Sequence, residues 1–320
     1  MAFPLIWVGG LVTTYGAGMA VPDWPNTYGW NMFLYPPSAW IFGGFDLLVE
    51  HGHRLLASLA GLVTIGLWFA AIKCDTRRWF RWWCSGVLLA VIFQGALGGA
   101  RVLLDERTAA MIHGCAAQLF LAMATATAVM CSRWWVAGSG IDCTRNSHST
   151  FPQLQPANRS LAWTVTLLLI LAYFQVIAGA ALRHIPVSAR PGAFMGIVHI
   201  HLTFAGLVLA TTLFAVLTAA RSINLWGGVK KPVFLILLTV LFQITLGSGT
   251  WLANYALPWQ ELTTDLANYT ITSKGYWESL VITGHVATGA LLISLVTLTC
   301  VRAWRGRWIC RQSVASVSAK

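Results

Sequence analysis

The chain has 320 residues, of which only 10% are charged and 57% are hydrophobic, and its mean hydropathy is +0.67. Soluble globular proteins carry about 25% charged residues, so this composition excludes a water-soluble protein and leaves no room for a separate soluble domain. The seven cysteines are odd in number and show no CxxC spacing, which argues against a cysteine metal site and against a disulfide framework.

Apolar runs separated by polar or Gly/Pro-rich stretches predict eight membrane-spanning helices, at about 20 residues per span. The first run follows almost directly after Met1 and lacks the basic segment of a secretory signal, so we expect a short first span. The runs cover residues 3–19, 46–72, 83–102, 109–131, 161–182, 194–219, 233–253 and 279–301. The predicted fold is an all-α integral membrane protein in which eight transmembrane helices form two pseudo-symmetric four-helix bundles. Residues 1–135 form the N-terminal half, 136–160 a cytoplasmic linker and 161–320 the C-terminal half.

The distribution of lysine and arginine predicts the orientation of these spans. Of the 21 basic residues, 15 lie in the connections after even-numbered spans or in the C-terminal tail, and five lie on the other side. By the positive-inside rule both termini are cytoplasmic, and the protein is a multi-pass protein of the cell's inner (cytoplasmic) membrane. The same asymmetry explains the net charge of +11 without a nucleic-acid partner.

A short pattern recurs in the third, fifth and seventh spans, where Phe-Gln is followed by a glycine four residues after the glutamine. The three copies are Phe93-Gln94 with Gly98, Phe174-Gln175 with Gly179, and Phe242-Gln243 with Gly247. A glycine one helical turn beyond the glutamine allows a neighbouring backbone or a flat ligand to approach closely. Plain helix packing explains the pattern equally well.

Histidines lie near the outer end of every even-numbered span, all at a similar depth. Ionisable groups inside a membrane are costly and are functional by default, and one histidine in each alternate span indicates a shared ligand-binding role. The candidates are His53, His113, His285 and, in the sixth span, either His199 or His201.

Spacing distinguishes the two candidates of the sixth span. One turn beyond His53, His113 and His285 the residue is alanine or glycine, as a planar macrocycle lying along the helix would require. The residue one turn after His201 is Ala205, whereas His199 is followed by the bulkier Thr203. Residues two apart point about 200° apart on a helix, so His199 and His201 cannot both face one ligand. We expect His201, with His199 as the alternative.

Four neutral imidazoles can bind zinc, copper or haem iron. Two histidines in each half, on different helices and beside small and aromatic residues, fit two haems better than one compact metal cluster. Glu50 lies three residues before His53 and so shares its helix face. A carboxylate there is a candidate acid or base, or a group that positions the substrate. The alternative for Glu50 is an ion pair with Arg54 or an interfacial carboxylate at the start of the helix. Arg54 could instead extend outward to haem propionates.

These residues resemble the haem A synthase family, whose members convert haem O to haem A. The matching stretches are Gly9-Gly10-Leu11-Val12-Thr13, Gly18-Met19, Pro22-Asp23-Trp24-Pro25, Glu50-His51-Gly52-His53-Arg54-Leu55, Gln94-Gly95-Ala96-Leu97-Gly98-Gly99, Met111-Ile112-His113 and Thr283-Gly284-His285. The combination of Glu-x-x-His-Arg with the four-histidine layout makes the resemblance specific. This chain differs from many members of the family because its predicted outer loops contain no cysteine pair.

The resemblance implies a role for each of these residues. His53 and His113 would hold the substrate haem O, His201 and His285 would be axial ligands of a haem b cofactor, and Arg54 would contact a haem. Glu50 would assist the oxidation of a haem methyl group to a formyl group by successive hydroxylation, giving haem A for terminal oxidases. The implied partners are the lipid bilayer, haem O from a haem O synthase, and an electron donor that the sequence does not identify. The alternative function is a diheme b-type membrane electron carrier, which needs the four histidines but has no use for Glu50.

Overall fold

The computed structural model describes residues 1–137, 156–186, 188–222, 225, 227–255 and 275–318, and its regular secondary structure there is helical. Seven of these helices are long and apolar enough to cross a membrane. The elements are α1 (Ala2–Thr14), the 3-10 turn η1 (Ala17–Met19), α2 (Pro37–Ile41), α3 (Phe45–Cys74), α4 (Arg78–Leu104), α5 (Arg107–Met130), α6 (Arg133–Ala137), α7 (Arg159–Arg183), α8 (Pro191–Arg221), α9 (Gly227–Tyr255) and α10 (Tyr276–Ser318). The chain is therefore a multi-pass, all-helical membrane protein.

Local sequence explains where several of the long helices begin and end. The first turn of α3 carries Asp46 and its last turn carries Lys73, which places each charge where it favours the helix dipole. Asn158 caps α7, because its side chain accepts a hydrogen bond from the backbone N–H of Leu161. Pro191 occupies the first turn of α8, where its missing N–H costs nothing.

The first apolar run differs from the expected span. Helix α1 has 13 residues, and a helix of that length extends about 20 Å, compared with the roughly 30 Å of a bilayer core. The chain turns after Thr14 because Gly16 adopts a left-handed conformation with φ of 64°, which glycine takes without strain. The seven long helices lie at the other seven predicted positions, so the expected set of eight spans is confirmed only for these seven.

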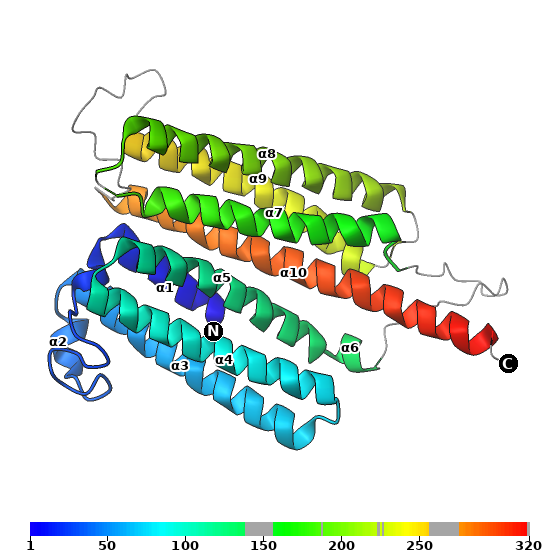
Figure 1. Ribbon diagram of the computed structural model, residues 1–320, viewed down its shortest axis with the longest axis horizontal. Helices are drawn as coiled ribbons and strands as arrows, with labels where there is room; N and C mark the ends of the chain where they lie inside the picture. The colour runs from blue at the N-terminus through cyan, green and yellow to red at the C-terminus, as the bar shows by residue number, and fades with distance from the viewer. Residues whose placement is uncertain (138–155, 187, 223–224, 226, 256–274, 319–320) are drawn as a thin grey trace.

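Two groups of helices lie side by side in Figure 1. Helices α1, α3, α4 and α5 form one group and α7, α8 and α9 the other, and the long α10 lies between them. Helix α10 contacts α7 and α9 as well as α1 and α5. The expected symmetry of the two bundles, and their division by a linker at 136–160, stay predictions. Most of that linker lies outside the described residues.

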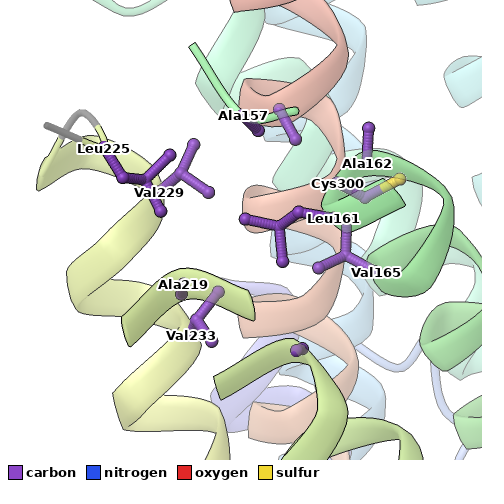
Figure 2. Close-up of a cluster of buried hydrophobic side chains, with 11 residues drawn as sticks. Ala157, Leu161, Ala162, Val165, Ala219, Leu225, Val229, Val233 and Cys300 are labelled. Atoms are coloured by element: carbon purple, nitrogen blue, oxygen red, sulfur yellow. The ribbon is translucent and has the colours of Figure 1, made fainter. Parts of the chain in front are cut away.

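A cluster of buried apolar residues joins the helices of the C-terminal group (Figure 2). The cluster includes Leu161 and Val165 of α7, Ala219 of α8, Val233 of α9 and Ala303 of α10, each at most 1% exposed. Many larger apolar side chains instead face outward; examples are Leu62, Phe69, Trp82, Leu89 and Ile92. An apolar exterior around a core of small residues is what a helix bundle in lipid requires.

One cysteine of the described chain forms a disulfide. Cys310, near the end of α10, is disulfide-bonded, which is a single bond and not the framework that the odd count argued against. Pairing depends on which chain segments meet in space, and sequence spacing alone does not reveal it. The remaining cysteines of the described chain are free, namely Cys74, Cys84, Cys115, Cys131 and Cys300.

Candidate functional site

Four histidines each pack against a glycine of the preceding long or apolar helix. In each case, a Cβ atom built on the glycine would lie 3.0 to 3.1 Å from Cε1 of the imidazole, a separation at which the ring would have to move. The pairs are His53 with Gly9, His113 with Gly98, His201 with Gly179 and His285 with Gly247. Three of these glycines belong to the recurring Phe-Gln pattern, so that pattern marks the positions against which the imidazoles pack.

The histidines of the C-terminal group face one another. The ring centroids of His201 on α8 and His285 on α10 lie 6.4 Å apart with an interplanar angle of 69°. Two imidazoles that coordinate one metal atom from opposite sides place their ring centres roughly 6 Å apart, because each metal–nitrogen bond is about 2.0 Å long. At this separation both imidazoles could bind a single iron atom, if one were present.

The histidines of the N-terminal group, His53 on α3 and His113 on α5, are also close enough to interact electrostatically. Both rings are half-buried. The Nδ1 atom of His53 is buried and has no hydrogen-bond partner among the described residues, and the same holds for Nδ1 of His201. Buried polar atoms are rarely left unpaired, so each of these groups points to an additional ligand or partner.

The other two candidate histidines lie elsewhere. His199 is exposed on α8, so of the two histidines considered for this helix the structure places His201 opposite His285. His51 is 1% exposed, shares a 3.2 Å hydrogen bond between its Nδ1 and Oγ1 of Thr27, and packs against the rings of Tyr35 and Trp40. His51 thus anchors the loop that precedes α3.

Glu50 forms a buried ion pair with Arg54. Nη2 of Arg54 donates to Oε1 of Glu50 over 2.9 Å, and the backbone N–H of Val21 donates to Oε2 over 3.1 Å. Glu50 is 2% exposed and Arg54 8%. The structure therefore shows the ion pair, which was the alternative to an outward-reaching arginine, and it holds the carboxylate on the face of α3 that carries His53.

Arg54 also binds the loop that covers the end of the N-terminal group. Its guanidinium donates to the backbone carbonyls of Asp23, Asn26 and Val21 over 2.6 to 3.0 Å. The ring of Trp24 lies over Gly99 of α4, where an added Cβ would come within 2.6 Å of the indole. We call residues 15–44 the cap loop, because these contacts hold it over α3 and α4.

A carboxylate stabilises the tip of the cap loop from within. Partial burial opposes ionisation of Asp23, but hydrogen bonds from the backbone N–H groups of Gly29 and Tyr28 outweigh it and lower the pKa of Asp23 below its ordinary value. The bonds are 2.8 Å from Gly29 and 2.9 Å from Tyr28. Asp23 therefore remains ionised at neutral pH and organises the turn beside Trp24.

Comparison with known proteins identifies the family. The sequence pattern of the family described as cytochrome oxidase assembly protein (COX15-CtaA) matches residues 43–262, more than half of the chain. The chain belongs to the cytochrome oxidase assembly protein family, which is the family of the haem A synthases. A comparison with curated proteins finds no match. The matched segment contains His53, His113 and His201, and the structure adds His285 of α10 to the same arrangement.

The residues of this cytochrome oxidase assembly protein fit two haems. Within the described chain no group of three or more His, Cys, Asp or Glu side chains could hold a metal ion, whereas two histidine pairs stand on different helices. Glycines keep the space beside each ring narrow, and two ring nitrogens are buried without a partner. Paired imidazoles with apolar surroundings are typical donors for haem iron.

Two arginines that are not among the predicted site residues lie beside these sites. The guanidinium of Arg101 on α4 packs directly on Gly18, where it fills the place of a Cβ, and it interacts electrostatically with Glu50. Nη2 of Arg183 on α7 donates to the carbonyl of Gly10 over 2.8 Å and to the hydroxyl of Thr14 over 2.5 Å. The sequence feature that could have identified these two arginines is their place at the ends of predicted spans. Their partners, however, lie far away in the sequence.

His184, just beyond α7, shows the effect of this basic surrounding. Burial first, and then the charges of Arg183, Arg101 and Arg107, lower the pKa of His184 to about 4. His184 is therefore neutral at physiological pH. The positive charge around His184 is therefore carried by Arg183, Arg101 and Arg107.

Proposed function

We propose that this protein is a haem A synthase, which oxidises a methyl group of haem O to a formyl group by successive hydroxylation. Membership of the cytochrome oxidase assembly protein family supports this role. The observation that carries the proposal is the buried carboxylate of Glu50, one helical turn before His53 and present in only one of the two histidine pairs of the described chain. An electron carrier needs two equivalent pairs and gains nothing from such a group.

The two pairs then have different tasks. His53 and His113 hold haem O, and His201 and His285 hold haem b, which supplies one-electron chemistry when bound. Because the glycines leave little room beside each imidazole, the rings keep their orientation while a haem is exchanged or oxidised. The protein's contribution is orientation of the substrate and exclusion of water from its reacting methyl group.

Glu50 acts at the edge of the substrate in this proposal. Its two oxygens accept hydrogen bonds from Arg54 and Val21, which fix the plane of the carboxylate. Each oxygen retains a lone pair, so the group can accept a proton or hold an oxidised carbon by a hydrogen bond. Arg54 sets the position of Glu50 and, through the cap loop, closes the same site.

The cellular setting follows from the same proposal. The enzyme lies in the cytoplasmic membrane with both termini in the cytoplasm and receives haem O from a haem O synthase. Each hydroxylation balances with dioxygen as the oxidant: one oxygen atom enters a C–H bond of the methyl group, and the other leaves as water with two protons and two electrons from a separate donor. The second hydroxylation gives a hydrate that loses water to form the formyl group. Because the substrate is itself lipophilic, it reaches the histidines from the bilayer.

Haem analysis tests the proposed function. Membranes of a host that produces haem O but no haem A are extracted with and without this protein, and the haems are separated and identified by mass. The expected result is a formyl-bearing haem only when the protein is present. If the protein accumulates with bound haem yet haem O is the sole product, the protein is a carrier and the proposed function is wrong.

A further inference from the structure

The four histidine–glycine contacts share one register that extends beyond the glycine. Each imidazole also faces the backbone carbonyl of the residue four positions before its glycine. For His285 this contact is a 3.2 Å hydrogen bond between Nδ1 and the carbonyl of Gln243. The residues at this position are Leu5, Gln94, Gln175 and Gln243. Three of the four equivalent positions therefore carry glutamine, and the one facing His53 carries leucine.

Each glutamine amide contacts the histidine of its own helix pair. Nε2 of Gln94 donates to the carbonyl of His113 over 2.9 Å and lies 3.2 Å from Nδ1 of its ring. Nε2 of Gln243 donates to the carbonyl of His285 over 2.8 Å. These bonds tie α4 to α5 and α9 to α10 at the level of the imidazoles.

Gln175 approaches its ring from the other side. Its Nε2 lies 3.2 Å from Nε2 of His201, so the amide contacts the imidazole itself. All three glutamines share a further property: their Oε1 atoms are buried and have no partner within the described chain. Rotation of the terminal amide can therefore offer an acceptor to a ring N–H once the opposite ring nitrogen binds iron.

Such partners determine how firmly a histidine holds its metal. A ligating imidazole usually donates its free N–H to an acceptor, which fixes the ring and raises its basicity, and loss of that partner typically costs about 10- to 100-fold in metal affinity. The leucine side chain has no group that can serve. His53 therefore has only the backbone carbonyl of Leu5, which all four rings share in kind, and the contact with Gly9 to hold it against α1. Nδ1 of His201 is unpaired like Nδ1 of His53, but Gln175 contacts the other nitrogen of the His201 ring.

We propose that Gln94, Gln175 and Gln243 are positioning residues that lock three of the four imidazoles, and that His53 is the ligand that releases and rebinds during haem exchange. This inference rests on the proposed function, because only an enzyme whose substrate is a haem must let one haem enter and leave. It assigns the exchange step to the α1–α3 side of the N-terminal pair. The haem b pair, with a glutamine on both histidines, stays loaded.

Haem transfer tests the proposal. Purified full-length protein is loaded at both sites with iron protoporphyrin IX, an excess of apomyoglobin is added, and the loss of haem is followed by optical absorption. Wild type should lose haem in two phases, of which the slow phase is absent in His285→Ala. The fast phase then belongs to the pair that contains His53.

Each substitution at the shared register should change the rate of haem loss in one of the two phases. Leu5→Gln should slow the fast phase by about tenfold, whereas Leu5→Met, which has similar length but no amide, should leave it unchanged. Gln243→Met should accelerate the slow phase by about tenfold and shift the midpoint potential of that haem. Gln118→Met is the matched control, because Gln118 is a buried glutamine of α5 outside the register, and it should move neither phase.

Two results would overturn the proposal. One is an unchanged fast phase in folded Leu5→Gln, and the other is an unchanged slow phase in Gln243→Met. Should Leu5→Gln fail to insert, Gln94→Met gives the answer, because loss of the lock on His113 must make the fast phase faster still. The assay does not depend on haem A formation. Two phases with no haem A in cells would refute the synthase alone, and haem A formation with equal phases would refute the exchange role of His53 alone.

Discussion

The N-terminal and C-terminal helix groups hold their histidines by the same contact and differ in what surrounds it. In both groups a glycine lies within van der Waals contact of each imidazole. The N-terminal group adds the buried pair of Glu50 and Arg54, the cap loop bound to Arg54, and Arg101 packed on Gly18. The C-terminal group has a glutamine contact on both histidines. One helix arrangement thus carries a histidine pair beside a buried ion pair and the cap loop, and a second histidine pair in which both members contact a glutamine.

The largest difference is expected when a ligand of the retained haem is removed. His285→Ala should leave almost no stably bound haem b, because the opposing His201 alone leaves an open coordination position that no described side chain can fill. His199→Ala is the control on an exposed histidine and should keep haem within about twofold of wild type by pyridine haemochrome assay. Loss of haem b in His199→Ala with retention in His201→Ala would reverse the assignment on α8.

Removing the charge of Glu50 should separate catalysis from haem binding. Glu50→Gln preserves size and one of the two hydrogen-bond acceptors but removes the charge and the capacity to accept a proton, so haem A formation should fall by about 10²- to 10⁴-fold while haem b stays bound. Accumulated haem O, measured by extraction and mass analysis, should account for the missing product.

Arg54→Met shows the effect of losing the ion pair alone, because it breaks the pair with Glu50 but leaves the carboxylate of Glu50 in place. Breaking a buried pair costs about 3 to 5 kcal/mol, so both variants should unfold at lower temperature. If haem A formation tracks thermal stability equally in the two variants, Glu50 serves structure only.

The contacts between the glycines and the histidine rings should be sensitive to one methyl group added at the glycine. Gly247→Ala places a Cβ about 3.0 Å from Cε1 of His285, so the ring must shift, and we expect a changed midpoint potential and severalfold lower haem b content. Gly206→Ala on α8 has nothing within 4 Å of the new atom and should be neutral or stabilising by up to about 1 kcal/mol. Equal redox potentials in both variants would show that the close contact does not control the ring.

The smallest expected effect is the acid response of the cap loop. Because backbone N–H bonds lower the pKa of Asp23 in the folded loop, its contribution to stability is full above its ordinary value of about 3.9 and is lost as pH falls through the lowered pKa. Hydrogen exchange of residues 21–30 should accelerate in Asp23→Asn at pH 7. The difference from wild type should shrink below about pH 4, and a difference that grows in acid would contradict this account.

Sequence patterns predicted the seven long helices of the described chain, because an apolar run depends on local order along the chain, whereas the haem-binding roles of the histidines stay predictions. An apolar run bounded by charges identifies a span, and the small residue one turn after His201 distinguishes it from His199. The recurring glutamine and glycine were visible, but only the structure shows that Gly98, Gly179 and Gly247 seat the imidazoles. Gly9 makes the same contact with His53, and Leu5 lies four residues before it, but no Phe-Gln pair marks these two positions in the sequence.

Other features depend on contacts between distant segments and could not be read from the sequence. The early end of α1 follows from a left-handed turn at Gly16, inside a run whose hydropathy continues. Both an ion pair and an outward-reaching Arg54 were compatible with its i, i+4 spacing from Glu50, and the cap-loop carbonyls explain its inward position. The contacts of Arg101 with Gly18 and of Arg183 with Thr14 likewise join separate helices.

The most direct test of the central claim compares the haems made and retained by two variants, one from each helix group. His113→Ala and His285→Ala are expressed in a host that supplies haem O, and the haems of the purified proteins and their membranes are identified by mass. We predict that His113→Ala retains haem b and forms no haem A, whereas His285→Ala loses haem b. Haem A formation by His113→Ala at a rate near wild type, or loss of haem b from His113→Ala but not from His285→Ala, would contradict the division of labour between the two groups.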